Sequence, residues 1–195
     1  MNMFLALAAS LLAAHSAFAV NYDVLIRNGT IYDGTGAPPY KADIAISGDR
    51  LSAIGSFEQD TAALVVDAAG LAVTPGFFNL LSHAHVSLIT DGRAMSDVLQ
   101  GVTFEVLSEA SLSPLSDSAA EFWAALFAEE DVELTWRTVN EYLETVESSG
   151  VAPNFATFVS AATVRVNVLG MDDVDPTPEQ LELMKSQVAQ AMQHG

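Results

Sequence analysis

The pattern of hydrophobic residues changes at Pro75-Gly76, and this change limits the folds open to the chain. Before it, short apolar runs are separated by turn residues at close intervals, which is typical of an all-β domain. After it, strand-like runs alternate with helical ones, which is typical of a parallel α/β arrangement. The sequence therefore predicts two parts of different architecture, residues 20–74 and residues 75–195.

The first part contains five or six short apolar runs. One of them, residues 22–27, stops at Asn28-Gly29, a strong hairpin-turn pair. Another pair of runs is separated by Gly48-Asp49, a second turn signal. Short strands with turns at this spacing favour a small β-sandwich or an open barrel. The other predicted strands lie at residues 30–32, 42–46, 50–54, 63–66 and 71–73.

The second part contains predicted strands and helices in alternation. Apolar runs at residues 77–81, 102–107 and 155–159 predict buried strands. Ser116 can cap a helix that runs to about residue 128, and Thr135 can cap another that ends before Gly150.

The last predicted helix has the clearest start in the chain. Thr177 serves as the N-cap, Pro178 occupies the first helical position and Gln180 completes a capping box. Apolar residues form a stripe along one face of this helix. Its members are Leu181, Met184, Val188 and Met192.

The length sets a further limit on the second part. An eight-unit (β/α)8 barrel needs about 250 residues, and residues 75–195 fall well short of that. The chain also finishes on a helix that no strand follows. We therefore expect an incomplete TIM-type barrel of two or three βα units, preceded by the β-sandwich part of a composite domain.

Residues 1–19 have the pattern of a secretory signal peptide. They carry no charged side chain, contain an apolar stretch at residues 4–14, and end in Ala17-Phe18-Ala19, an A-x-A cleavage pattern. The alternative is a short buried or membrane helix, but the apolar stretch is too short to span a bilayer. The sequence predicts export, to the periplasm or the exterior, with cleavage after Ala19.

The composition excludes several functions. The chain has 25 acidic and 7 basic side chains and a formal charge of −18, which argues against binding nucleic acid or an anionic membrane surface. With no cysteine, it has no disulfide, no thiolate nucleophile and no cysteine ligand for zinc. Any metal site must use histidine or carboxylate ligands.

His83 and His85 follow the predicted strand at residues 77–81. Alternation along a strand points both the same way, and sites in such barrels lie at the carboxyl ends of the strands. Imidazole is a good ligand for zinc. The alternative is two polar residues in an ordinary β-to-α loop. A zinc site needs three or four ligands, and the third histidine after residue 19 is the distant His194.

Several segments together resemble one family, the metal-dependent amidohydrolases. Within it, the chain is most similar to the D-aminoacylase (N-acyl-D-amino-acid deacylase) group. The resemblance covers essentially all of the chain after residue 19. The matching segments are residues 22–39, 43–55, 67–77, 100–103 and 172–178.

The resemblance implies a composite β-sandwich plus a (β/α)8 barrel. It also implies a divalent metal, usually zinc, whose bound water attacks the carbonyl of a small-molecule amide. A bound metal lowers the pKa of water to near 7 and polarises the carbonyl. The family's general-base aspartate belongs to a late strand outside this sequence, so we expect no catalytic residue of that kind here.

The sequence departs from the family pattern at the metal ligands. The resemblance places the two metal histidines at Leu81 and His83, so one is missing and His85 is an extra histidine. The family's metal-bridging cysteine falls at about Ala110, next to Glu109. Glu109 could replace it as a ligand, or it could be an ordinary loop acid. The predicted metal contacts are therefore His83, His85 and Glu109.

Arg165 is a candidate for substrate binding. The family's glycine-histidine motif corresponds to residues 160–165, which contain no histidine but retain Arg165. A guanidinium matches the geometry of a substrate carboxylate. A structural ion pair would explain this arginine equally well.

Two functions follow. The first is the N-terminal portion of an exported amidohydrolase that hydrolyses the amide bond of N-acyl-D-amino acids with metal-activated water, a fragment inactive alone. The alternative is an exported, non-catalytic remnant or binding paralogue of the same fold. Leu81 and Ala110 favour the alternative, whereas His83 and Glu109 favour the enzyme.

Overall fold

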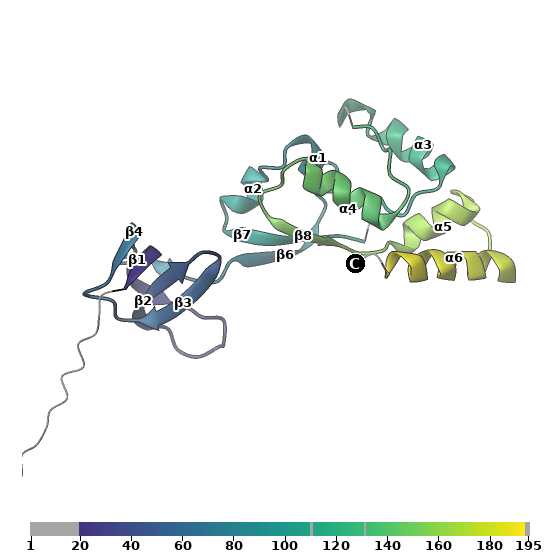
Figure 1. The fold of residues 1–195 in the computed structure, drawn as a ribbon. Coiled ribbons are helices and arrows are strands. Elements are labelled where there is room, and N and C mark those ends of the chain that lie inside the picture. The colour runs from purple at the N-terminus through teal and green to yellow at the C-terminus, as the bar shows by residue number, and fades with distance from the viewer. Residues whose placement is uncertain (1–19, 110, 131, 194–195) are drawn as a thin grey trace, which may run out of the picture. The chain divides into compact units, whose positions relative to one another are not determined.

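The computed structural model describes residues 20–109, 111–130 and 132–193. It divides into two compact units on either side of the Pro75–Gly76 bond, the position at which the hydrophobic pattern changes (Figure 1). The predicted signal peptide, residues 1–19, lies outside the described residues, as do Ala110 and His194. Within the described residues, no helix is both long and apolar enough to cross a bilayer.

The first unit is one mixed sheet of five strands. The order is β3-β2-β1-β4, and β5 also pairs with β1. The pairs β1–β2 and β2–β3 are antiparallel, whereas β4 and β5 run parallel to β1. The described residues of this unit form a single sheet, without the second layer that a sandwich needs. The strands are β1 (Asn21–Ile31), β2 (Tyr40–Ser47), β3 (Arg50–Gly55), β4 (Thr61–Asp67) and β5 (Ala72–Val73).

The predicted hairpin turn at Asn28-Gly29 is wrong, because β1 continues through both residues. The pairing with β2 shifts between Ile26 and Gly29, so this segment is a β-bulge. Asn28 adopts a positive φ of 63°. Its backbone N–H donates to Asp43 (2.9 Å) and its side-chain amide donates to Asp67 (2.9 Å), which ties the bulge to both neighbouring strands.

The second unit contains a parallel sheet with the order β6-β7-β8. Helices lie between and after the strands, as the alternating pattern predicts. The strands are β6 (Phe77–Ser82), β7 (Val102–Leu107) and β8 (Asn154–Thr157). The helices are α1 (Ser87–Thr90), α2 (Met95–Val98), α3 (Asp117–Leu126), η1 (Ala128–Glu130), α4 (Val139–Ser148), α5 (Ala161–Leu169) and α6 (Pro178–Ala191).

The predicted start of α4 is wrong by three residues. Thr138, and not Thr135, is the N-cap, and Glu141 completes its capping box. Trp136 cannot join the helix because its indole N–H donates to the Leu112 carbonyl in the core, at 2.6 Å. The caps predicted for α3 at Ser116 and for α6 at Thr177 are confirmed.

Two features of the helices lie outside the predictions. Helix α5, capped by Ser160, was not predicted. The apolar stripe of α6 is largely uncovered, since Leu181, Val188 and Met192 are 38% to 68% exposed. Among its described residues only Ala191 is buried.

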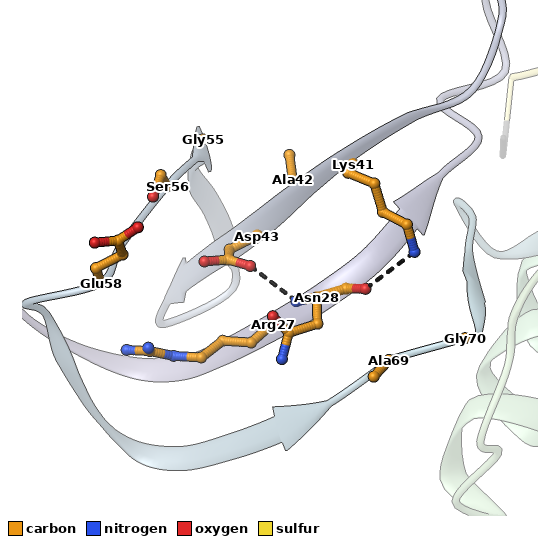
Figure 2. Close-up of a pocket in the computed structure, with 10 residues that line it drawn as sticks. All are labelled: Arg27, Asn28, Lys41, Ala42, Asp43, Gly55, Ser56, Glu58, Ala69 and Gly70. Carbon is orange, nitrogen blue, oxygen red and sulfur yellow. Dashed lines mark hydrogen bonds between the residues drawn. The ribbon is translucent and has the colours of Figure 1, made fainter.

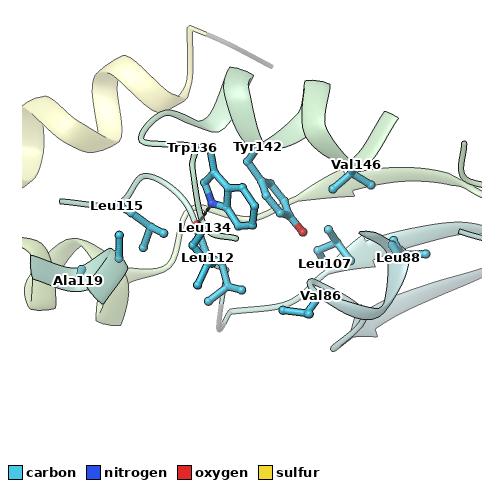
Figure 3. Packing of buried hydrophobic residues seen from close by; sticks show 11 residues of the cluster. Val86, Leu88, Leu107, Leu112, Leu115, Ala119, Leu134, Trp136, Tyr142 and Val146 are labelled. Atoms are coloured by element: carbon cyan, nitrogen blue, oxygen red, sulfur yellow. Dashed lines mark hydrogen bonds between the residues drawn. The ribbon is translucent and has the colours of Figure 1, made fainter. Parts of the chain in front are cut away.

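One face of the parallel sheet packs on the main hydrophobic core (Figure 3). Leu107 of β7 is fully buried there with Leu88, Trp136, Tyr142 and Val146. Strand alternation turns Phe104 to the opposite face, where its ring stacks on Phe78, 5.0 Å between centroids. Phe78 is 64% exposed, so that face is uncovered among the described residues.

Gly29 gives a test of the sheet in the first unit. A Cβ at this buried glycine would lie 2.6 Å from Cγ2 of Val73. We therefore expect Gly29→Ala to lower the free energy of unfolding, measured by urea denaturation, by about 1–3 kcal/mol.

Gly55→Ala is the matched control, because its Cβ would meet nothing closer than 3.9 Å. This control should change stability by less than about 0.5 kcal/mol. Equal effects of the two substitutions would contradict the bulge packing.

Candidate functional site

The site lies where β6 and β7 end side by side. Ser82 pairs with Leu107, and the backbone N–H of Ser108 donates to the Ser82 carbonyl at 2.9 Å. The exposed His83 follows, and its Nδ1 lies 3.1 Å from the hydroxyl of Ser108. Ser108 is fully buried. The predicted position of His83, at the carboxyl end of the first barrel strand, is therefore where the structure has it.

His85 differs from His83 in its surroundings. Its side chain is only 4% exposed, and its carbonyl accepts a hydrogen bond from the Tyr142 hydroxyl at 3.0 Å. Burial lowers the pKa of the imidazole, which favours the neutral ring. Among the described residues, nothing hydrogen-bonds to its buried Nε2.

Glu109 is exposed and follows Ser108 directly. Its negative charge raises the pKa of His85, whereas the charge of His83 lowers it, and both effects are smaller than that of burial. Ser108 contacts the His83 ring and directly precedes Glu109 in the chain, so His83 and Glu109 lie near each other at the ends of β6 and β7. His85 is instead buried in the core.

These residues do not form a metal centre by themselves. Within the described part of the chain, no three histidine or carboxylate side chains are grouped closely enough to hold an ion. Leu81, where the resemblance places a metal histidine, offers no donor and is 58% exposed. Imidazole and carboxylate are nevertheless donors that zinc accepts, so His83 and Glu109 fit as contributors to a larger site. The ligand roles remain predictions.

Arg165 lies on α5 and is held by backbone groups. Its Nη2 donates to the carbonyls of Asp172, at 3.1 Å, and Val174, at 2.7 Å. The guanidinium thus ties down the loop that follows α5. A role in binding a substrate carboxylate remains a prediction.

Sequence reasoning missed Glu105, the most unusual side chain near the site. It is fully buried in β7, its Oε2 accepts from the Ser82 hydroxyl at 2.6 Å, and its Oε1 has no partner among the described residues. Burial raises the pKa of this carboxyl, and the charge of Asp97 raises it further. A charged residue inside the run at residues 102–107 was the available signal.

The first unit contains an open groove of about 760 Å³ with several charged side chains in its lining (Figure 2). Three of them, Arg27, Lys41 and Asp43, are engaged with the chain itself. The Arg27 guanidinium donates to the carbonyls of Phe57 and Asp60, and the Lys41 ammonium donates to the Asn28 carbonyl. These three charges therefore stabilise the sheet and its loops, and we assign no ligand to this groove.

Known proteins resemble this chain over nearly all of its length. An uncharacterized protein of Mycobacterium tuberculosis (strain ATCC 25618 / H37Rv) is 31% identical over 195 residues, 90% of this chain and 32% of that protein. A D-aminoacylase of Alcaligenes xylosoxydans xylosoxydans is 30% identical over 176 residues, 89% of this chain and 36% of the enzyme. No family model matches the chain.

Solved structures give the same result. The crystal structure of a D-aminoacylase, described as defining a subset of amidohydrolases, has a TM-score of 0.79 at 29% identity, over 89% of this chain and 37% of that one. An N-acyl-D-glutamate deacylase from Bordetella bronchiseptica, complexed with zinc and a phosphonate inhibitor, has a TM-score of 0.76 at 28% identity, over 89% of this chain and 36% of that one.

The predicted resemblance is confirmed: homologues and structural neighbours of this chain are D-aminoacylases and related deacylases of the amidohydrolase superfamily. The chain spans about a third of the length of the curated relatives it matches. Its sheets and helices are consistent with a part of their TIM-barrel fold.

Glu105 gives a pH-dependent test of the sheet. Its pKa is raised by burial in the folded state, so the folded protein binds this proton more tightly than the unfolded chain. The contribution of Glu105 to the free energy of unfolding is therefore most favourable at acid pH and is lost as the pH rises through the pKa of the folded state. We expect Glu105→Gln to raise the stability at pH 7, in EDTA, by about 1–2 kcal/mol.

The same substitution should have no stabilising effect near pH 4, where the native carboxyl keeps its proton. Urea unfolding at both pH values measures the difference. Glu109→Gln removes the same charge from an exposed position and should change stability little at either pH. A stability loss for Glu105→Gln at pH 7 would contradict this account.

Proposed function

We propose that this chain is the N-terminal portion of an exported amidohydrolase that hydrolyses the amide bond of N-acyl-D-amino acids. The match to D-aminoacylase, with a TM-score of 0.79 over 89% of this chain, carries the proposal. The first unit would supply part of a composite β-sandwich, and β6 to β8 would be the first strands of a (β/α)8 barrel. Export rests on the signal-peptide pattern of residues 1–19.

A divalent metal, zinc in our proposal, would be the cofactor. One structural neighbour is complexed with zinc and another with copper. When bound, such a metal supplies an activated water and polarises the amide carbonyl.

His83 is the residue of this chain best placed to hold the metal. Its Nδ1 is engaged by Ser108, which fixes the ring and leaves Nε2 for the metal. A hydrogen bond to one ring nitrogen commonly selects the tautomer that ligates through the other. Glu109 would contribute a carboxylate, and His85 would contribute only if its buried Nε2 became accessible. Arg165 would bind the substrate carboxylate only by releasing the loop carbonyls.

The described residues do not complete the centre, so we expect the 195-residue polypeptide to be inactive alone. The remaining ligands and the general base would have to come from other residues of the complete protein.

A second candidate function is a non-catalytic protein of the same fold. Leu81, which stands where the resemblance places the first metal histidine, specifically favours it. Loss of one ligand from a three- or four-ligand zinc site weakens binding strongly. Such a protein would keep the fold and bind its amide ligand, or nothing, without turnover.

The complete product of the gene that encodes this chain tests the two functions. Loaded with zinc, it should bind at least one ion per chain. It should also hydrolyse N-acetyl-D-amino acids to acetate and the free amino acid faster than it hydrolyses the L-isomers. We expect His83→Ala to lower kcat/KM by about 100-fold or more and to lower zinc content, since imidazole donates directly to the metal.

Glu121 provides a matched control for Glu109. We expect Glu109→Gln to lower kcat/KM about tenfold, a smaller effect than that of His83→Ala. Glu121→Gln, at an exposed position of α3, should leave activity unchanged. Less than one zinc per chain with no turnover of either isomer would instead support the non-catalytic function.

A further inference from the structure

A chain of hydrogen bonds joins the buried Glu105 of β7 to the backbone beside His83. The Ser82 hydroxyl donates to Oε2 of Glu105 at 2.6 Å, and the same hydroxyl accepts from the backbone N–H of Ala84 at 3.2 Å. Ser82 and Ala84 are the two neighbours of His83 in the sequence. A serine that binds the backbone two residues further on forms a local turn. The hydroxyl of Ser82 therefore closes a turn that has His83 at its centre.

Ser82 is well suited to hold this turn because it is fixed in the interior. The residue is only 4% exposed, and its carbonyl accepts from the backbone N–H of Ser108. A serine side chain has three staggered rotamers. The bond to Glu105 selects the rotamer in which the hydroxyl also meets the N–H of Ala84.

Glu105 is an unfavourable residue for a buried strand unless its acceptor is needed. Its side chain is fully buried, and no salt bridge contains it among the described residues. Of its two oxygens, only Oε2 has a partner there, and that partner is Ser82. An apolar residue would avoid the cost of burying a carboxyl. Proteins keep such unfavourable choices mainly at functional sites.

The turn also determines where the ring of His83 lies. Its Nδ1 is 3.1 Å from the hydroxyl of Ser108, and this contact requires the backbone of His83 to stay at the end of β6. Without the two bonds of the Ser82 hydroxyl, the backbone could rotate and the ring would leave Ser108. A metal ligand is most effective when its neighbours hold it in place before the metal binds.

We propose that Glu105 is a positioning residue for His83 and acts through the hydroxyl of Ser82. The carboxyl fixes the serine, the serine fixes the turn, and the turn keeps the imidazole against Ser108 with Nε2 free. The benefit for zinc binding rests on the proposed function, in which His83 is a metal ligand. The positioning itself belongs to the metal-free protein. It requires a hydrogen-bond acceptor at residue 105 and not a negative charge.

NMR spectra of the metal-free complete gene product, with 15N-labelled histidine rings, test the positioning. The wild-type signals of His83, identified by their loss in His83→Ala, should show one tautomer with the proton on Nδ1, because Ser108 holds that nitrogen. Ser82→Ala and Glu105→Leu should each give shifts averaged over both tautomers. Glu105→Gln keeps an acceptor and should keep the wild-type spectrum.

Zinc affinity, measured by competition with a chelator, tests what the positioning contributes. Ser82→Ala and Glu105→Leu should weaken zinc binding by about 10- to 100-fold, the usual effect of losing a group that orients a ligand. Glu105→Gln should bind zinc as the wild type does.

Ser149→Ala is the matched control for Ser82→Ala. It removes a hydroxyl that donates to the carbonyls of Leu88 and Val146 in the same unit. This control should change neither the His83 signals nor the zinc affinity.

Three results would overturn the proposal. The first is wild-type His83 signals in the folded variants of Ser82 and Glu105, since the bonds would then support only the strand. The second is an equal effect of Glu105→Gln and Glu105→Leu, which would show that the charge matters and not the acceptor. The third is unchanged zinc affinity in variants whose ring signals shift. A wild-type protein that binds no zinc would instead contradict the proposed function, and the ring spectra would still decide the positioning.

Discussion

The contact between the ends of β6 and β7 is the interaction on which the site depends. Ser82 takes part twice: its carbonyl accepts from the Ser108 backbone, and its hydroxyl donates to the buried Glu105. Ser108 then contacts His83 through its own hydroxyl. Both serines are buried, so water competes little for these bonds. The exposed His83 is thereby held by groups that are themselves fixed in the interior.

Packing in the hydrophobic core also holds the ends of β6 and β7 in place. Leu107 anchors β7 in the core, and Tyr142 of α4 donates to the His85 carbonyl. Burial raises the pKa of Tyr142, which keeps its hydroxyl protonated as a donor. The segment from His83 to His85 thus leaves a strand end and enters the core within two residues. This explains why the two histidines, although only two residues apart in the sequence, have different environments.

Much of the fold could be predicted because local signals agreed with tertiary packing. The strand at residues 102–107 and the cap at Thr177 are examples. Predictions failed where a distant contact decided the outcome. Asn28 makes a bulge because two neighbouring strands bind it. At the site, the position of His83 was predictable, but the burial of His85 was not, since strand alternation says nothing of what packs on the following loop.

The central claim is that His83 holds a catalytic metal at this strand end. X-ray absorption at the zinc edge, on the zinc-loaded complete gene product and its His83→Gln variant, tests it most directly. The account predicts imidazole scattering from a stoichiometric zinc, with one imidazole fewer in the variant. A spectrum that the substitution leaves unchanged, or a wild-type protein that retains no zinc, would contradict it.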